Sequence, residues 1–197
     1  MKKNIYLLLT IAFFCISCLG QSKNERKTVY NKDFKWTINI PSGFDSVSAD
    51  VWAKMQNPGQ DMVEKTYDAK LENNVKTIFV FRSDETNYFE SNYQPFDTSK
   101  DGNYLENFRE VNNILYGTFE AQIKNAKLDS SSSTQVVSGL KFQTFKVAIT
   151  LPNKMVLNVL MYSRLFGNRE FTVNIMALDR QKEKELLECW FNSKFDK

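Results

Sequence analysis

A regular alternation of apolar and polar residues between Gln143 and Leu178 constrains the fold more than any other feature of the sequence. The turn residues Pro152-Asn153 and Gly167-Asn168 divide it into three runs. The apolar rows of these runs are Phe145, Val147, Ile149 and Leu151, then Met155, Leu157, Val159 and Met161, then Phe171, Val173, Ile175 and Ala177. A side-chain period of two, bounded by turn residues, is typical of antiparallel strands with one buried face. We therefore predict a three-stranded meander.

The sequence before the meander predicts two further strands and a short helix. Residues 28–40 alternate as one half-buried strand, with Phe34, Trp36, Ile38 and Ile40 on its apolar face. A helix is expected after Ser48, with Pro58-Gly59 closing it. Residues 75–82 are apolar on both faces, which predicts a central strand covered on both sides.

Two amphipathic helices are predicted to cover the sheet. The longer one follows the cap candidates Thr98, Ser99 and Asp101, and its apolar residues recur at spacings of three and four. Those residues are Leu105, Phe108, Val111, Leu115, Phe119, Ile123 and Ala126. The closing helix begins after Asp179, and its apolar face holds Leu186, Leu187, Trp190 and Phe191. The expected fold class is therefore α+β: an antiparallel sheet with a hairpin meander covered by amphipathic helices, an α/β/α sandwich.

The segment 83–100 has no clear period and is interpreted as a long loop. It contains the aromatic residues Tyr88, Phe89, Tyr93 and Phe96. A structureless segment of this length in a compact domain is either functional or held by its own side chains. The rings either anchor the loop to the sheet or form an interaction surface, and we take these four residues as the candidate interaction loop.

The serine run Ser130–Ser133 is a second polar segment. No glycine-rich elbow surrounds it and no partner base is nearby, so the pattern disfavours a nucleophile. We predict an exposed edge strand or a loop.

The first 20 residues have the pattern of a signal peptide. Lys2 and Lys3 precede an apolar run, 5–14, that is too short for a membrane span of about 20 residues. Cys15-Ile16-Ser17-Cys18 is similar to a bacterial lipobox, with cysteine where leucine is usual, which makes Cys18 the candidate lipidation site. Cleavage after Gly20 is the alternative. We expect a signal peptide over 1–20, a tether over 21–27, and one domain over 28–197, in an exported protein that is either a periplasmic lipoprotein or secreted.

The composition excludes several classes of function. The sequence has no histidine, which removes Ser-His-Asp and Cys-His catalysis and the usual zinc sites. Without residues 1–17, which hold Lys2 and Lys3, 24 basic residues (26 − 2) face 23 acidic ones, so no basic stripe predicts nucleic-acid binding. Cys189 is the one cysteine in residues 28–197, and its helical context predicts a small buried hydrophobe. We predict no catalytic residue, metal or cofactor.

Carboxylates provide the one remaining basis for catalysis. Asp84-Glu85 and Glu90 flank the aromatic segment, and Asp97 and Asp101 follow it. Two carboxylates at suitable separations can hydrolyse glycosides, and acidic clusters can bind calcium weakly. No known loop spacing is present, so solvated acids are the default interpretation.

Three motifs resemble the PsbP-like α/β/α sandwich, a group that includes bacterial lipoproteins of DcrB type. They are Ile40-Pro41-Ser42-Gly43-Phe44, Ser138-Gly139-Leu140-Lys141-Phe142 and Phe191-Asn192-Ser193-Lys194-Phe195, placed around a central helix. The resemblance covers nearly all of 28–196. It implies a small non-enzymatic domain that docks on other proteins, with no shared active site.

These observations leave two main hypotheses about function. The first is a non-enzymatic envelope lipoprotein that acts as a protein-interaction or assembly module, held at the membrane by a lipid on Cys18 and docked on an unidentified envelope protein. The second is a carrier of an apolar small ligand between sheet and helix, suggested by the 16 phenylalanines. An uncharacterised hydrolase is a third alternative.

Overall fold

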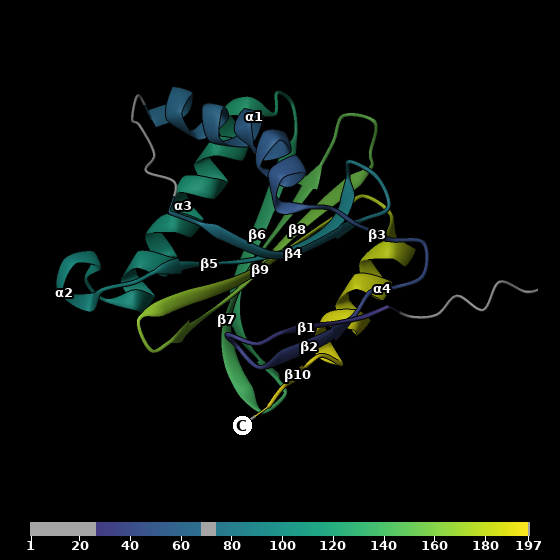
Figure 1. Cartoon of the computed structure of the whole chain (residues 1–197). Helices are drawn as coiled ribbons and strands as arrows, with labels where there is room; N and C mark the ends of the chain where they lie inside the picture. Colours follow the sequence, from purple (N-terminus) through teal and green to yellow (C-terminus); the bar gives the residue numbers. More distant parts are fainter. Residues whose placement is uncertain (1–26, 68–73, 197) are drawn as a thin grey trace, which may run out of the picture.

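The computed structural model describes residues 27–67 and 74–196, and Figure 1 shows their arrangement. Within these residues, a seven-stranded antiparallel sheet has the order β3-β4-β5-β9-β8-β7-β6. Its strands are β3 (Asp45–Ser46), β4 (Lys76–Arg82), β5 (Asn87–Pro95), β6 (Lys127–Val137), β7 (Leu140–Thr150), β8 (Val156–Phe166) and β9 (Arg169–Ala177). The predicted meander is confirmed as β7, β8 and β9.

Helices and a small second sheet cover the two faces of this main sheet. The helices are α1 (Ala49–Tyr67), α2 (Thr98–Asp101), α3 (Tyr104–Gln122) and α4 (Arg180–Phe191). The small sheet pairs β1 (Thr28–Asn31) with β2 (Trp36–Asn39), and β2 with β10 (Lys194–Phe195). Figure 1 shows α1 and α3 on one side, with α4 and the small sheet on the other. The α+β sandwich predicted from the sequence is confirmed.

Aromatic rings fill the space between the main sheet, α4 and the small sheet. Trp36 of β2 and Trp190 of α4 are fully buried and meet edge to face, with ring centroids 6.0 Å apart. Phe171 of β9 lies 5.2 Å from the Trp36 ring, and Phe195 of β10 stacks on that ring at 5.7 Å. Edge-to-face and stacked pairs add stabilisation beyond their buried area. This layer therefore joins both ends of the described chain to the main sheet.

A second apolar cluster lies beneath α3. Phe108 of α3 packs with four sheet residues, namely Phe145, Val147, Ile149 and Met161. The N-cap of α3 is Asn103, whose side chain accepts hydrogen bonds from the N–H groups of Leu105 and Glu106. The predicted caps are therefore wrong, because Thr98, Ser99 and Asp101 belong to the separate turn α2, which Asp97 caps.

Two predicted boundaries at the start of the domain are also wrong. Residues 28–40 form the hairpin β1–β2 and not one strand, because the chain turns at 32–35, where Lys35 has a φ of 47°. The helix predicted to end at Pro58-Gly59 continues to Tyr67. A proline inside a helix removes one backbone hydrogen bond. The helix continues because it packs on α3, where Gln122 donates a hydrogen bond to Thr66 at 2.9 Å.

The interpretation of 83–100 as a loop is wrong, because β5 occupies residues 87–95 between β4 and β9. Phe89, Ser91 and Tyr93 face the aromatic layer, whereas Glu90 and its alternate neighbours face α1 and α3. A central strand with polar residues on a covered face lacks the apolar alternation that identifies strands in a sequence. The polar side chains are accommodated on this covered face because they form hydrogen bonds with one another and with β9.

Candidate functional site

The four aromatic residues proposed as an interaction loop do not form one surface. Phe89 and Phe96 are buried. Tyr88 packs edge to face on Trp52 of α1, with centroids 4.9 Å apart, and burial raises the pKa of its hydroxyl. Tyr93 points to the opposite face of β5, where its ring lies 5.4 Å from Phe34. These rings anchor β5 to both neighbouring layers, so they belong to the core.

A network of polar side chains, buried or partly buried, links β5, β8 and β9 to the start of α3. The Tyr104 hydroxyl donates to Ser163 Oγ at 2.9 Å, and Ser163 Oγ donates to Glu170 at 2.7 Å. Gln94 donates to the other oxygen of Glu170 at 2.9 Å. Burial raises the pKa of Tyr104 to about 12, although the bond to Ser163 lowers it. Each group has a partner, as buried polar groups require, so this network positions α3 on the sheet.

Glu90 is the second buried carboxylate on this face. Asn92 and Asn174 donate to its two oxygens at 3.1 Å each. Glu90 lies opposite Asn174 on β9, four residues along the strand from Glu170. At about 3.3 Å per residue, the backbone positions of the two glutamates are roughly 13 Å apart along the sheet. Both carboxylates are held by amide donors of neighbouring side chains, which is the pattern of structural groups.

Asp84 organises the turn between β4 and β5. It accepts hydrogen bonds from Thr86 N and Oγ1 at 2.9 Å and from Asn87 Nδ2 at 2.8 Å, and its Oδ2 lies 2.7 Å from Lys182 Nζ of α4. Partial burial raises the pKa of Asp84, but the Lys182, Asn87 and Thr86 bonds together lower it well below its usual range. Asn87 in turn accepts from the N–H groups of Leu178 and Asp179. Asp84 therefore joins the turn to the start of α4 and acts as a structural group.

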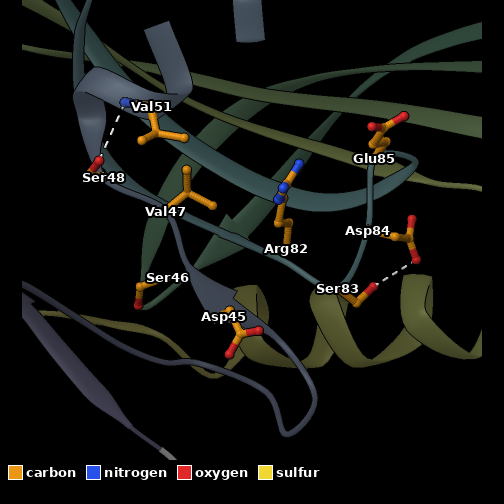
Figure 2. Close-up of a pocket in the computed structure, with 9 residues that line it drawn as sticks. All are labelled: Asp45, Ser46, Val47, Ser48, Val51, Arg82, Ser83, Asp84 and Glu85. Carbon is orange, nitrogen blue, oxygen red and sulfur yellow. Dashed lines mark hydrogen bonds between the residues drawn. The ribbon is translucent and has the colours of Figure 1, made fainter. Parts of the chain in front are cut away.

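An open pocket of about 450 Å³ lies beside this turn. Figure 2 shows its two rims: residues 45–51, from β3 to the first turn of α1, and residues 82–85, from the end of β4 into the turn. Arg82 contributes the one basic side chain of the lining, and its Nη1 lies 3.6 Å from Met55 Sδ. Asp45, Asp84 and Glu85 give the lining an excess of acid. Within the lining, the Ser83 hydroxyl donates to Asp84 Oδ2 at 3.1 Å (Figure 2), and the same oxygen bonds Lys182.

Cys189 is buried in α4 beneath the aromatic layer. Burial raises the pKa of its thiol to about 12, which keeps it protonated at neutral pH. Across residues 27–67 and 74–196, no three Cys, Asp or Glu side chains gather as a metal site would require. None of the helices in the described part of the chain is long and apolar enough to cross a bilayer. Cys18, the candidate lipidation site, lies outside the described residues.

The outer edge of β6 is the longest unpaired sheet edge among the described residues. All 11 residues of β6 pair with β7 in one continuous register, without a bulge. The serine run lies at its centre, and residues 129–136 are exposed on both faces. Of the two interpretations that the sequence left open for the serine run, an exposed edge strand or a loop, the structure shows the edge strand. The sequence pattern did not single out Leu128 and Val136, which lie on the α3 side at the two ends of the strand, although their even spacing in the sequence is a signal for one face.

The opposite edge of the main sheet is closed by several features. β3 contributes only two paired residues, Asp45 and Ser46. β4 beside it shifts register against its inner neighbour β5 between Thr77 and Phe79, and α1 packs against β4. Short strands, irregular register and covering elements are common means of preventing further strand pairing. The two edges therefore differ sharply in what they offer another chain.

Comparison with known proteins identifies the fold. The solution structure of cyanobacterial PsbP (CyanoP) from Synechocystis sp. PCC 6803 aligns with 91% of this chain and 98% of its own length, with a TM-score of 0.55 and 10% sequence identity. No protein-family model and no curated protein sequence matches this chain. The chain has a PsbP-like α+β sandwich fold, as its sequence motifs implied. At this level of identity the likeness describes the fold and not the activity.

Proposed function

We propose that this protein is a non-enzymatic interaction module of the bacterial cell envelope that docks through the outer edge of β6. The observation that carries the proposal is the 11-residue edge, regular along its whole length and unpaired among the described residues. An exposed edge offers a row of backbone N–H and C=O groups to an extended segment, which can add as a further strand. Main-chain hydrogen bonds supply affinity in this mode, and side chains of alternate residues supply specificity.

The polar network beneath α3 and the turn at Asp84 support a structural interpretation of the other charged groups. The Glu90, Glu170 and Asp84 carboxylates all accept hydrogen bonds from protein donors. The rings that suggested a carrier of an apolar ligand contact one another across the aromatic layer. An interaction surface is therefore the function that the described residues favour.

We further propose that export and acylation of Cys18 hold the domain at a membrane. An acyl-modified N-terminal cysteine provides the two or more chains that stable anchoring needs. Ten residue steps separate Cys18 from Thr28, the first residue of β1, and each step spans at most about 3.5 Å. The domain could therefore stand up to roughly 35 Å from the bilayer surface. Mass spectrometry of the N-terminal peptide tests this step, since a peptide that begins at Gln21 would contradict it.

Site-specific photo-cross-linking in cells tests the docking surface. A photoreactive amino acid replaces Ser131 on the β6 edge, and a matched control replaces Glu110, which is exposed on the polar face of α3. We expect a discrete protein adduct from position 131 and none from position 110. The proposal is wrong if position 131 gives no adduct, and an adduct from position 110 alone would assign docking to the α3 face.

A further inference from the structure

We infer that the partner of the β6 edge is a second copy of this chain, paired antiparallel about a two-fold axis at Ser132. This inference rests on the proposed function, because it names the occupant of the same edge. The axis would join two seven-stranded sheets edge to edge, with α3 of both copies on the same side. Isologous contacts of this kind are the commonest in homodimers, and they require a surface that is complementary to itself.

The sequence of β6 meets that requirement. With Ser132 opposite its counterpart, Ser131 lies opposite Ser133, and Ser130 opposite Thr134. Hydroxyl pairs directly across two strands stabilise antiparallel pairing. The same register places Asp129 opposite Gln135, where the amide can donate to the carboxylate. No two like charges of β6 face each other in this arrangement.

Two apolar side chains fix the register. Val136 is 60% exposed, the largest exposed fraction among the large hydrophobic residues of the described chain, and it lies on the α3 side. Leu128 lies on the same side and packs on the apolar cluster beneath α3. In the proposed register, Val136 of one copy meets Leu128 of the other, twice by symmetry. Moving the axis by one residue in either direction would place Val136 opposite Ala126 or Ser130, which leaves it without a large apolar partner.

The apolar pair is needed because a polar strand does not by itself specify the register in which it pairs. A strand that is polar on both faces specifies its register poorly, because a shift exposes nothing that was buried. Leu128 and Val136 supply the missing preference, since only one register covers both. The serine run between them has small side chains, each of which can form a hydrogen bond.

Disulfide trapping in the full chain tests both the partner and the register. Ser132→Cys places two thiols directly opposite, at a Cβ separation of about 5 Å, which small adjustments bring within disulfide reach. Ser130→Cys is the matched control: in the proposed register, the two copies of position 130 lie four residues apart along the strands, roughly 13 Å, which is beyond that reach. An equal mixture of Ser130→Cys and Thr134→Cys chains restores a facing pair. Unmodified chain measures the background of the native cysteines.

We expect a disulfide-linked dimer from Ser132→Cys, background levels from Ser130→Cys and from Thr134→Cys alone, and a linked heterodimer from the mixture. Equal linking of Ser130→Cys and Ser132→Cys would overturn the inference, because random collision gives that pattern. No linking of any variant, together with a heterologous adduct from position 131, would overturn the second copy and leave the docking function standing. No linking and no adduct would overturn both.

A charge test without cysteine gives an independent measurement. Ser132→Lys places like charges across the axis, and we expect the dissociation constant measured by sedimentation to rise by about fivefold or more. Ser132→Asp has the same effect alone, whereas an equal mixture of the two variants restores association. Both substitutions lie at an exposed position, so thermal unfolding of each variant should match that of the unmodified chain. If neither substitution changes the dissociation constant, the two-fold axis at Ser132 is refuted.

Discussion

Trp190 is predicted to be the most important single side chain for the stability of the domain. It is fully buried in α4, and its ring lies 5.1 Å from Phe142, 5.5 Å from Tyr162 and 6.0 Å from Trp36. It therefore joins the closing helix to the main sheet and to the small sheet. Trp190→Ala would remove these contacts and leave a cavity between three layers.

The expected loss in the free energy of unfolding follows from the size of that cavity. Large-to-small changes at buried aromatic positions cost about 3–5 kcal/mol. Domains of this size have roughly 5–15 kcal/mol of stability, so the variant would lose a large fraction of it. With a urea slope of about 2 kcal/mol/M, the unfolding midpoint should fall by about 2 M. Far-UV circular dichroism should report the transition, because it does not depend on the tryptophan that is removed.

Phe191 supplies a matched control on the adjacent residue of α4. It is 41% exposed, and its ring contacts Tyr162 at 6.1 Å. Phe191→Ala should cost about 1 kcal/mol, since much of the ring is already in water. If Trp190→Ala costs no more than Phe191→Ala, the aromatic layer does not hold α4 on the sheet and the reasoning is refuted.

Trp190→Phe separates ring packing from the indole N–H. That N–H has no acceptor among the described residues. A buried donor without a partner costs about 1–3 kcal/mol, so removing it offsets part of the lost ring area. We expect Trp190→Phe to cost about 1 kcal/mol, far less than the alanine variant.

Three further predictions concern single groups. The pKa of Asp84 is lower in the folded state than its unfolded value of about 3.9, so Asp84 stabilises the fold above that pH and loses this contribution as the pH falls toward its folded pKa. Asp84→Asn should therefore flatten the decline in thermal stability measured from pH 5 to pH 2. Gly139 has a φ of 76° in the hairpin between β6 and β7, and a Cβ added there would meet no atom within 4 Å; Gly139→Ala should cost about 1 kcal/mol in urea unfolding through backbone strain alone, and an unchanged midpoint would contradict this. The Cys189 thiol, with its pKa raised to about 12, should resist alkylation at pH 8 in the folded protein and react after denaturation, as mass spectrometry would report.

The parts of the fold that the sequence predicted well have local signals. The β7–β9 meander shows a period of two, and α4 begins at Asp179, whose side chain accepts from the N–H groups of Gln181 and Lys182. The serine run also has a local signal, because an all-polar strand can only lie at an exposed edge. Each of these features follows from residues that are close in the sequence.

The features that the sequence missed depend on distant partners. β10 pairs with Trp36 and Thr37 from the other end of the chain, and no local pattern indicates that pairing. β5 is a central strand whose polar side chains bond groups on β9, so its sequence resembles a loop. For the same reason, its aromatic residues were misassigned to an interaction surface. The assignment of Cys18 stays a prediction.

The contrast between the two sheet edges gives the strongest argument that the β6 edge has a function. α3 packs on β7 and β8, and α4 packs on β5 and β9, so neither helical layer accounts for the middle of β6, which is polar on both faces. Polarity alone keeps such a strand soluble, but it leaves the backbone groups of the edge available. A bulge or a proline in the exposed residues 129–136 would close the edge at little cost, because these residues bury no core. At the other side of the sheet the final strand β3 pairs only two residues and β4 shifts register against its inner neighbour β5, whereas β6 retains a continuous register over its full length. An edge kept regular where irregularity would cost little is best explained by a strand that pairs with it.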